Sequence, residues 1–401
     1  MHRVVITGVG PVSSIGVGAA EFEAALRAGK SGISPIRSFD SSGFEHRLAG
    51  EVQDFDPAAY LTRISPDEHG HAALFAAVAA RLAADDAGLA EFGPDTAVLM
   101  GTNSGEVRNI VALAKAWHHN GPSIPEPDIA GQISANRLAL AAARELGATG
   151  ETLTFGTACA AGNYAIGYAF DLLSTGAASV AIAGGADSVN RFTHAGFHRL
   201  GALAGEACRP FDRDRDGMLT AEGGVALVME TLDGARARGA RIYAEVLGHA
   251  MTCDASHPTA PDTASIARCM RASHTRAGLT PSDIGYICAH GTGTRVNDQV
   301  ETAAFREVFG TAIPPVSSIK SMLGHSMGAA SGFGAVASVL ALSSSFLPPT
   351  INHRFADPEL GPLDPVPNEA RRAELNVVQN NGFGFGGNNS ITLFGRLSCE
   401  S

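Results

Sequence analysis

The feature that most constrains the fold is the alternation of β-rich and alanine-rich runs along all 401 residues. Apolar runs such as residues 96–100 (TAVLM) and 179–187 (SVAIAGGAD) alternate with helical runs such as residues 72–89 (AALFAAVAARLAADDAGL). Strands separated by helices need crossover connections, and these favour parallel pairing with helices on both faces. The sequence therefore predicts an α/β fold with a mostly parallel sheet between helical layers.

The alternation restarts near residue 245, and the order of strands and helices is similar on both sides of that point. A chain of this length with 45% hydrophobic residues can bury a core large enough for two domains or two halves. We therefore expect two similar halves, residues 1–245 and 246–401. Repetition between individual residues is too weak to prove a duplication.

Charge and cysteine usage exclude several classes of protein. The formal net charge of −11 disfavours nucleic acid as a partner. Six cysteines without a CxxC spacing argue against a zinc site and a disulfide framework, and they indicate a reducing compartment. The first residues, MHRVVITGVG, lack the features of a signal peptide, so we expect a cytoplasmic protein. The glycines at 8, 10 and 16 do not have the spacing of a dinucleotide fingerprint.

The segment from Ser326 to His353 contains no Asp, Glu, Lys or Arg and is long enough to be mistaken for a membrane span. Most of its helical part, however, is Gly, Ala and Ser, with too few large apolar side chains to favour lipid. We therefore predict a central helix buried in the protein, and no membrane contact.

Cys159, in the stretch TFGTACAAGNYAIG, is the first candidate for chemistry. A lone cysteine usually packs as a small buried hydrophobe, and that alternative stays open from the residues alone. The preceding TLTF (152–155) nevertheless predicts a buried strand, and the residues from Cys159 onward predict a helix. Unpaired N–H groups at a helix start favour a thiolate and can bind an oxyanion.

Three further clusters lie in the second half. His290 follows the apolar run IGYICA in HGTGT, and His325 stands five residues after Lys320 in KSMLGHSMGAA. Reactive groups collect at the carboxyl ends of strands, so the two histidines are candidates for one site, although a structural role or zinc binding with Cys159 is conceivable. Residues 380–390 (NNGFGFGGNNS) predict a strand that closes into a glycine-rich loop, in which two phenylalanines suit an apolar gate.

Taken in order, TACAAG, RPFDRDRDGMLTAEGG, HGTGT, NDQVE, KSMLGH and GFGFGG resemble the β-ketoacyl-acyl carrier protein synthases of the type II condensing enzymes. The resemblance runs from VVITGVG to NNSITLF, which is essentially the whole chain. It implies a thiolase-like fold, with two similar halves stacked as α-β-α-β-α layers, usually in a homodimer or in a heterodimer with a homologous subunit. It also implies an acyltransferase without a metal, whose phosphopantetheine arrives on an acyl carrier protein.

The resemblance assigns roles to individual residues. Cys159 would carry the acyl group, and its N–H and that of the gate residue Phe385 would form an oxyanion hole. His290 and His325 would stabilise the enolate left when malonyl carrier protein loses CO2. Lys320 would position His325 in a charge network with Asp298 and Glu301. The residues implied to bind substrate are Thr292, Thr294, Ser104, Phe197 and Phe383, and RPFDRDRDG would form structural ion pairs around Arg209 and Asp212.

The chain departs from the fatty-acid members at three places. Many of them carry Glu nine residues after the second histidine, where this chain has Gly334. Ser104 stands where they often have isoleucine at the acyl-pocket wall. Asp67 and Glu68 occupy a region that is basic in members that grip the acidic carrier protein. These departures favour a specialised polyketide pathway over housekeeping fatty-acid elongation.

Other functions of the same fold fit less well. A non-catalytic chain-length subunit would lack the nucleophile that Cys159 supplies. A degradative thiolase would need a second active cysteine in a glycine motif, and Cys399 has none around it. A single-histidine initiating synthase would have asparagine in place of His325, and a hydrolase would carry a GxSxG elbow.

Overall fold

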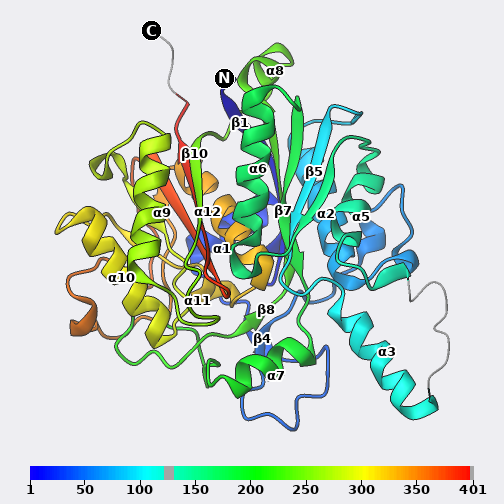
Figure 1. The fold of residues 1–401 in the computed structure, drawn as a ribbon, viewed down its shortest axis with the longest axis horizontal. Helices are drawn as coiled ribbons and strands as arrows, with labels where there is room; N and C mark the ends of the chain where they lie inside the picture. The colour runs from blue at the N-terminus through cyan, green and yellow to red at the C-terminus, as the bar shows by residue number, and fades with distance from the viewer. Residues whose placement is uncertain (122–130, 398–401) are drawn as a thin grey trace.

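The computed structural model describes residues 1–121 and 131–397, and its centre is one continuous sheet in the strand order β12-β11-β15-β16-β10-β1-β9-β7-β5-β6 (Figure 1). The first-half strands are β1 (Val4–Ser13), β5 (Thr96–Gly101), β6 (Thr152–Phe155), β7 (Val180–Asp187) and β9 (Gly223–Thr231). The second-half strands are β10 (Ala244–Cys253), β11 (Tyr286–Cys288), β12 (Val316–Ser317), β15 (Val377–Gly384) and β16 (Asn388–Gly395). Short strands complete the set: β2 (Gly16–Val17), β3 (Ser34–Pro35), β4 (Leu48–Gly50), β8 (Thr220–Ala221), β13 (Phe346–Leu347) and β14 (Arg371–Arg372).

The two halves of the sheet have the same pairing pattern. From the centre outward, β1–β9–β7–β5–β6 and β10–β16–β15–β11–β12 each begin with two antiparallel pairings and end with two parallel ones. The halves meet through β1 and β10 over a ladder of only three residue pairs, from Val4–Val246 to Ile6–Ala244. The prediction of a mostly parallel sheet was therefore wrong, because strands far apart in the chain pair antiparallel at the centre, β9 beside β1 and β16 beside β10. The predicted boundary at residue 245 falls at the start of β10 and stays a prediction.

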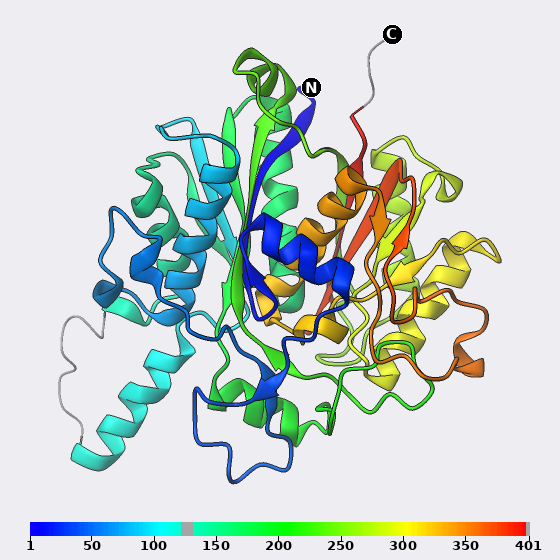
Figure 2. The same cartoon turned by 180° about the vertical axis from the view of Figure 1, so that it is seen from behind.

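Helices cover the sheet in layers (Figures 1 and 2). In the first half, α2 (His71–Asp86) and α5 (Arg137–Leu146) pack on one face, and α9 (Thr263–Arg276) and α10 (Arg295–Phe309) cover the outer face of the second half. Between the halves lie α6 (Ala161–Thr175), α12 (Ala330–Ser344) and α1 (Ala19–Ala28). This is the α-β-α-β-α stack of the thiolase-like fold. Further helices in the described residues are α3 (Val107–Asn120), α7 (Arg191–Arg199), α8 (Leu232–Ala237) and α11 (Lys320–Leu323).

The predicted central helix is α12, and its side chains are buried almost without exception. Within the described part of the chain, one segment, Met327–Ser344, is long and apolar enough to cross a membrane, and 89% of it is buried inside the protein. Its small residues let the backbone approach its neighbours closely: a Cβ at Gly332 would lie 2.7 Å from the Val225 side chain. The helix is therefore part of the core.

Two turns at the inner ends of α6 and α12 are equivalent in the two halves. A one-turn 3-10 helix (Ala158–Ala160) leads into α6, and another (Met327–Ala329) leads into α12. The first residue of each turn has a positive φ, 50° at Ala158 and 51° at Met327, although neither is glycine. Such strained positions cluster at functional sites. The strand before the first turn, β6, was expected to be buried but forms the sheet edge, where Leu153 is 38% exposed.

Candidate active site

Cys159 lies in the turn that leads from β6 into α6, as the sequence predicted for a helix start. The residue is only 6% exposed, and it lines a cavity of about 420 Å³. The end of β15 approaches this turn so closely that a Cβ at Gly384 would lie 3.2 Å from the Cys159 nitrogen. The glycine at position 384 therefore lets the two loops meet at the sulfur.

The thiol of Cys159 is not ionised by its helix start alone. Burial raises its pKa to about 11, and the nearby carboxylate of Asp187 acts in the same direction. The charge of Lys320 and the backbone N–H groups of Phe385 and Cys159 lower the pKa but do not outweigh burial. The N–H groups of the turn thus favour the thiolate as expected, but burial outweighs them and keeps the thiol protonated. The two N–H groups nevertheless act on the sulfur as the predicted oxyanion donors would.

The two histidines face each other, with ring centroids 5.6 Å apart and planes at 82°. Burial holds the pKa of both His290 and His325 well below the usual range, and the Lys320 charge lowers them further, so both rings are neutral. The Met327 N–H donates to His325 Nδ1 at 3.0 Å, which places the single ring proton of His325 on Nε2. His325 is therefore arranged as a hydrogen-bond donor and not as a base.

His290 is held through its backbone. The N–H groups of His290 and Gly291 each donate to a carboxylate oxygen of Glu301 at 2.8 Å. Lys320 Nζ donates to the His290 carbonyl oxygen at 2.5 Å. Lys320 was expected to position His325, but its hydrogen bond is to the backbone of His290, because α11 starts beside the HGTGT loop.

The predicted charge network is looser than expected. Among the residues that the structure describes, Lys320 has no carboxylate within ion-pair distance. Asp298 accepts the Phe211 N–H at 2.8 Å and lies 3.6 Å from the buried Arg215, so it joins the RPFDRDRDG segment. The ion pairs of that segment form around Arg209, which pairs with Glu206 and Asp216, and around Arg215, whose pairs with Asp298 and Asp357 are buried. Burial raises the pKa of both Asp298 and Glu301.

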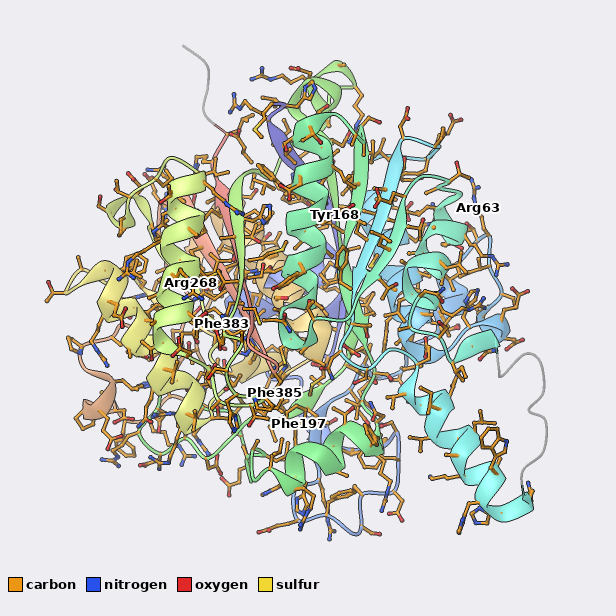
Figure 3. The ribbon with its side chains drawn as sticks, viewed as in Figure 1. Arg63, Tyr168, Phe197, Arg268, Phe383 and Phe385 are labelled. Atoms are coloured by element: carbon orange, nitrogen blue, oxygen red, sulfur yellow. The ribbon has the colours of Figure 1, made fainter. Side chains whose placement is uncertain are left out.

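The glycine-rich loop closes the site. β15 continues through Phe383 and Gly384, so the loop itself is shorter than predicted. The Phe383 ring lies 5.6 Å from the His290 ring. Phe385 is 40% exposed and packs against Phe197 of α7, with ring centroids 5.8 Å apart. Figure 3 shows Phe383, Phe385 and Phe197 one below the other between α9 and α7.

Most predicted site residues meet in the cavity. The residues of the prediction that line it are Cys159, His290, His325, Thr292, Thr294, Phe197, Phe383 and Phe385. The hydroxyl groups of Thr292 and Thr294 lie 2.8 Å apart. Ser104 does not line this cavity; its hydroxyl lies 3.2 Å from that of Thr193, and its N–H donates to Asp187. Ser104 as a wall of the acyl pocket is therefore not supported by this cavity.

Sequence reasoning missed Asp187, at the end of β7. This fully buried carboxylate accepts hydrogen bonds from Thr102 Oγ1, the N–H groups of Asn103 and Ser104, and the Gly328 N–H. It therefore joins the loop of Ser104 to the turn that follows His325. Burial raises its pKa to about 6. The signal that could have found it is an aspartate directly after an apolar strand.

Gly334 is a second position with an informative neighbour. A Cβ there would lie 2.4 Å from Asn380 Oδ1. The Asn380 amide is fixed, because its Nδ2 donates to Asn163 Oδ1 and to the Ser331 carbonyl, both at 2.8 Å. Uncharged amides thus fill the space in which many fatty-acid members have a glutamate.

The acidic pair near α2 is partly neutralised. Glu68 pairs with Arg144 at 3.1 Å and accepts from Arg137 through its carbonyl oxygen. Arg63 lies on this same α2–α5 side of the molecule, away from the phenylalanines (Figure 3).

In residues 1–121 and 131–397, no group of three His, Cys, Asp or Glu residues is arranged to hold a metal ion. Cys399 lies outside the described residues.

Comparison with known proteins agrees with this geometry. The chain matches "Beta-ketoacyl synthase, N-terminal domain" over residues 1–235 and "Beta-ketoacyl synthase, C-terminal domain" over residues 243–354. It is 40% identical to 3-oxoacyl-[acyl-carrier-protein] synthase 2 of Synechocystis sp. (strain ATCC 27184 / PCC 6803 / Kazusa) over 98% of this chain and 97% of that one.

Two solved structures are similar over 99% of this chain and all of theirs. The ishigamide ketosynthase/chain length factor is 48% identical with a TM-score of 0.97. A type II PKS acyl-carrier protein in complex with its ketosynthase bound to the hexaketide gives 29% identity and a TM-score of 0.89. With a cysteine and two neutral histidines in one cavity of a thiolase-like fold, the chain belongs to the β-ketoacyl synthase family and is a 3-oxoacyl-acyl carrier protein synthase, an acyltransferase.

Proposed function

We propose that the chain condenses an acyl group held on Cys159 with malonyl-acyl carrier protein, with loss of CO2, in a polyketide pathway. The observation that carries the proposal is the meeting of Cys159, His290 and His325 in one cavity. Each side chain comes from a different loop, and two of the loops belong to equivalent turns of the two halves. A nucleophile facing two neutral donors suits a reaction that develops negative charge without a metal.

The reaction has two stages. Cys159 Sγ attacks the thioester carbonyl of an acyl carrier protein, and the carrier thiol leaves with the proton of Cys159. Malonyl carrier protein then enters, its C–CO2 bond breaks, and the electron pair forms an enolate. The enolate carbon attacks the acyl-cysteine carbonyl, the C–S bond breaks, and the Cys159 thiolate that leaves takes up a proton from solvent. The product is a β-ketoacyl thioester two carbons longer.

The donors divide between two oxyanions. His325 Nε2–H and His290 would stabilise the enolate oxygen of the malonyl thioester, because a neutral imidazole can donate a hydrogen bond to that oxygen and keep its proton. The N–H groups of Cys159 and Phe385 would hold the oxygen of the tetrahedral intermediate, which is supported by their position at the sulfur. Lys320 would act on both centres: it lowers the pKa of Cys159 and fixes the His290 backbone.

The substrate would bring its own prosthetic group. Thr292 and Thr294 lie along the cavity, where their hydroxyl groups suit the amides of the phosphopantetheine arm of an acyl carrier protein. No further cofactor takes part in the proposed steps. Five free cysteines in the described residues suit a reducing compartment, and we place the reaction in the cytoplasm.

A polyketide pathway is favoured over fatty-acid elongation by the filled space at Gly334. The Asn163–Asn380 amides leave no room for the glutamate that many fatty-acid members have there. The likeness to the polyketide ketosynthase bound to its hexaketide points the same way. The likeness to 3-oxoacyl-[acyl-carrier-protein] synthase 2 keeps fatty-acid elongation as the alternative.

The enzyme would act as a homodimer or with a homologous subunit. α3 projects from the body of the molecule, and Val107 is its one buried residue (Figure 1). Its exposed side chains include Ile110 and Trp117, which are 46% and 43% exposed. The sheet edge at β6 also exposes Leu153. Unpaired strand edges and apolar helices of this kind suit coverage by another chain.

The test is intact-mass analysis of the protein after it meets a panel of acyl carrier thioesters of increasing length. We expect an adduct on Cys159 and, after malonyl carrier protein is added, its loss together with release of CO2. Acceptance of long or oxygenated β-ketoacyl chains supports the polyketide pathway, whereas restriction to saturated chains supports fatty-acid elongation. Absence of any adduct on Cys159 rejects the reaction itself.

A further inference from the structure

A line of buried polar side chains runs from α9 to the backbone of His290. His274 Nε2 lies 2.7 Å from Gln379 Oε1, and Gln379 Nε2 donates to Asn381 Oδ1 at 2.8 Å. Asn381 Nδ2 then donates to a Glu301 oxygen at 3.0 Å, and Glu301 accepts the His290 and Gly291 N–H groups. The line therefore connects the outer helical layer to the catalytic loop through four side chains.

The carboxylate of Glu301, at one end of the line, sets the direction of every hydrogen bond in it. An ionised carboxylate only accepts, so Asn381 must present its NH2 group to Glu301 and its oxygen to Gln379. Gln379 must then present its NH2 group to Asn381 and its oxygen to His274. His274 has to donate from Nε2. All the donors thus point toward Glu301.

Hydrogen bonds that all pointed away from Glu301 are disfavoured by His274, at the other end of the line. A protonated Glu301 would donate to Asn381 and reverse both amides, which requires His274 to accept at Nε2 and to carry its proton on Nδ1. His274 Nδ1 is buried without a partner in the described structure, and a buried unpaired N–H is costly. With the hydrogen bonds reversed, the Nδ1–H group of His274 would be a buried donor without an acceptor, whereas in the observed direction Nδ1 carries no proton.

The surroundings of His274 and Gln379 are apolar. Gln379 is 0% exposed and His274 is 3% exposed, and the layer around them is formed by residues such as Met270, Phe309 and Leu393. Apolar side chains that replaced the members of the line together would avoid the cost of burying polar groups, and such joint replacements often stabilise a protein. The line is therefore poorly explained by stability alone.

We propose that Gln379 and His274 are positioning residues that keep Glu301 ionised and thereby hold the His290 loop in place for malonyl decarboxylation. The proposal rests on the proposed function. A carboxylate that accepts two backbone N–H groups fixes that loop, and the directed amides stabilise its charge. Lys320 holds the other side of the same residue through the His290 carbonyl.

Several charged or titratable groups face Glu301 from the elements around it. They are Asp298 on the same helix, Lys320 on α11, Cys288 on β11 and His290 in the loop that Glu301 binds. Burial and, to a smaller extent, the Asp298 charge raise the pKa of Glu301, whereas the donated hydrogen bond of Asn381 lowers it. Removing the donors behind Asn381 therefore raises the pKa of Glu301 and makes it protonate at higher pH.

The experiment measures three quantities for each protein: release of CO2 from malonyl carrier protein as a function of pH, acylation of Cys159, and the melting temperature. Gln379→Met and His274→Phe remove the donors but keep most of the volume, and His274→Gln restores a donor. Tyr286→Phe is the matched control. Tyr286 lies on β11, the strand beside β15, and the substitution removes its equally buried hydrogen bond to Ser317 of β12.

We expect Gln379→Met and His274→Phe to lower decarboxylation about 10- to 100-fold, the range for groups that orient a site residue. The acid limb of the rate should move to higher pH, and acylation of Cys159 should stay close to parental. His274→Gln should recover most of the rate, and Tyr286→Phe should leave the acid limb in place. In the parental protein, 15N NMR should find His274 as the neutral Nε2–H tautomer.

The outcomes separate the two proposals. A parental protein that does not decarboxylate malonyl carrier protein overturns the proposed function. If the parental protein decarboxylates malonyl carrier protein and the folded variants keep its rate and its acid limb, the proposed role of Gln379 and His274 is overturned. If the variants do not fold, the tautomer decides, since a proton on Nδ1 of His274 contradicts the direction of the line.

Discussion

The resting state of Cys159 gives a prediction that can be worked out from the structure. With a pKa of about 11, the sulfur at pH 8 is three pH units below its midpoint, so about one molecule in a thousand carries a thiolate. A cysteine with the usual value of 9.0 would be about one-tenth ionised. Alkylation of the folded, substrate-free enzyme should therefore be slower by about 100-fold than that of an ordinary thiol.

The assay is the rate of iodoacetamide labelling of the Cys159 peptide between pH 7 and 10, with the same peptide in urea-denatured protein as the reference. We expect the rate in the folded protein to rise about tenfold per pH unit without reaching a plateau. Lys320→Met should slow labelling at every pH, because the Lys320 charge lowers the pKa of the thiol. A plateau below pH 9 would refute the argument that burial outweighs the donors around the sulfur.

Three further predictions concern the neighbours of the sulfur. His290→Ala or His325→Ala should each lower decarboxylation of malonyl carrier protein by roughly 10² or more, the scale for one oxyanion donor, and should affect Cys159 acylation less; parental CO2 release in both would contradict this. Gly334→Ala should cost about 1 to 3 kcal/mol of unfolding free energy, since its Cβ would lie 2.4 Å from Asn380 Oδ1, and Asn380→Ala in the same chain should recover part of it in urea titrations. Phe385→Ala should slow condensation for every acyl length, and a loss confined to long chains would assign Phe385 to the acyl pocket instead.

The sequence predicted the layers because they depend on local patterns, whereas the resemblance supplied most of the residues that meet in the cavity. Alternating apolar and alanine-rich runs are enough to predict α/β layers, and the uncharged run is enough to predict the buried α12. The pairing directions were not predictable in this way. The antiparallel centre depends on β9 and β16 returning beside β1 and β10, which is a contact between segments far apart in the chain.

The errors within the site have a common physical cause. The ionisation of Cys159 and the partner of Lys320 depend on burial and on loops from the other half, and neither is encoded near the residue itself. Asp187 was missed for the same reason, since its importance comes from bonding two loops that are over 200 residues apart. The assignment of Ser104 to the acyl-pocket wall came from the resemblance and stays a prediction; its hydroxyl lies 3.2 Å from that of Thr193.

The duplicated turns explain how two similar halves make one asymmetric site. Each half places a strained residue, a 3-10 turn and a 15-residue helix after its outer strand. In the first half the turn carries Cys159, the proposed nucleophile, whereas in the second half the N–H of Met327 fixes the ring proton of His325. The same type of turn therefore presents the Cys159 sulfur in one half and orients the His325 donor in the other. The contact between α6 and α12 brings Cys159 and His325 to the same cavity.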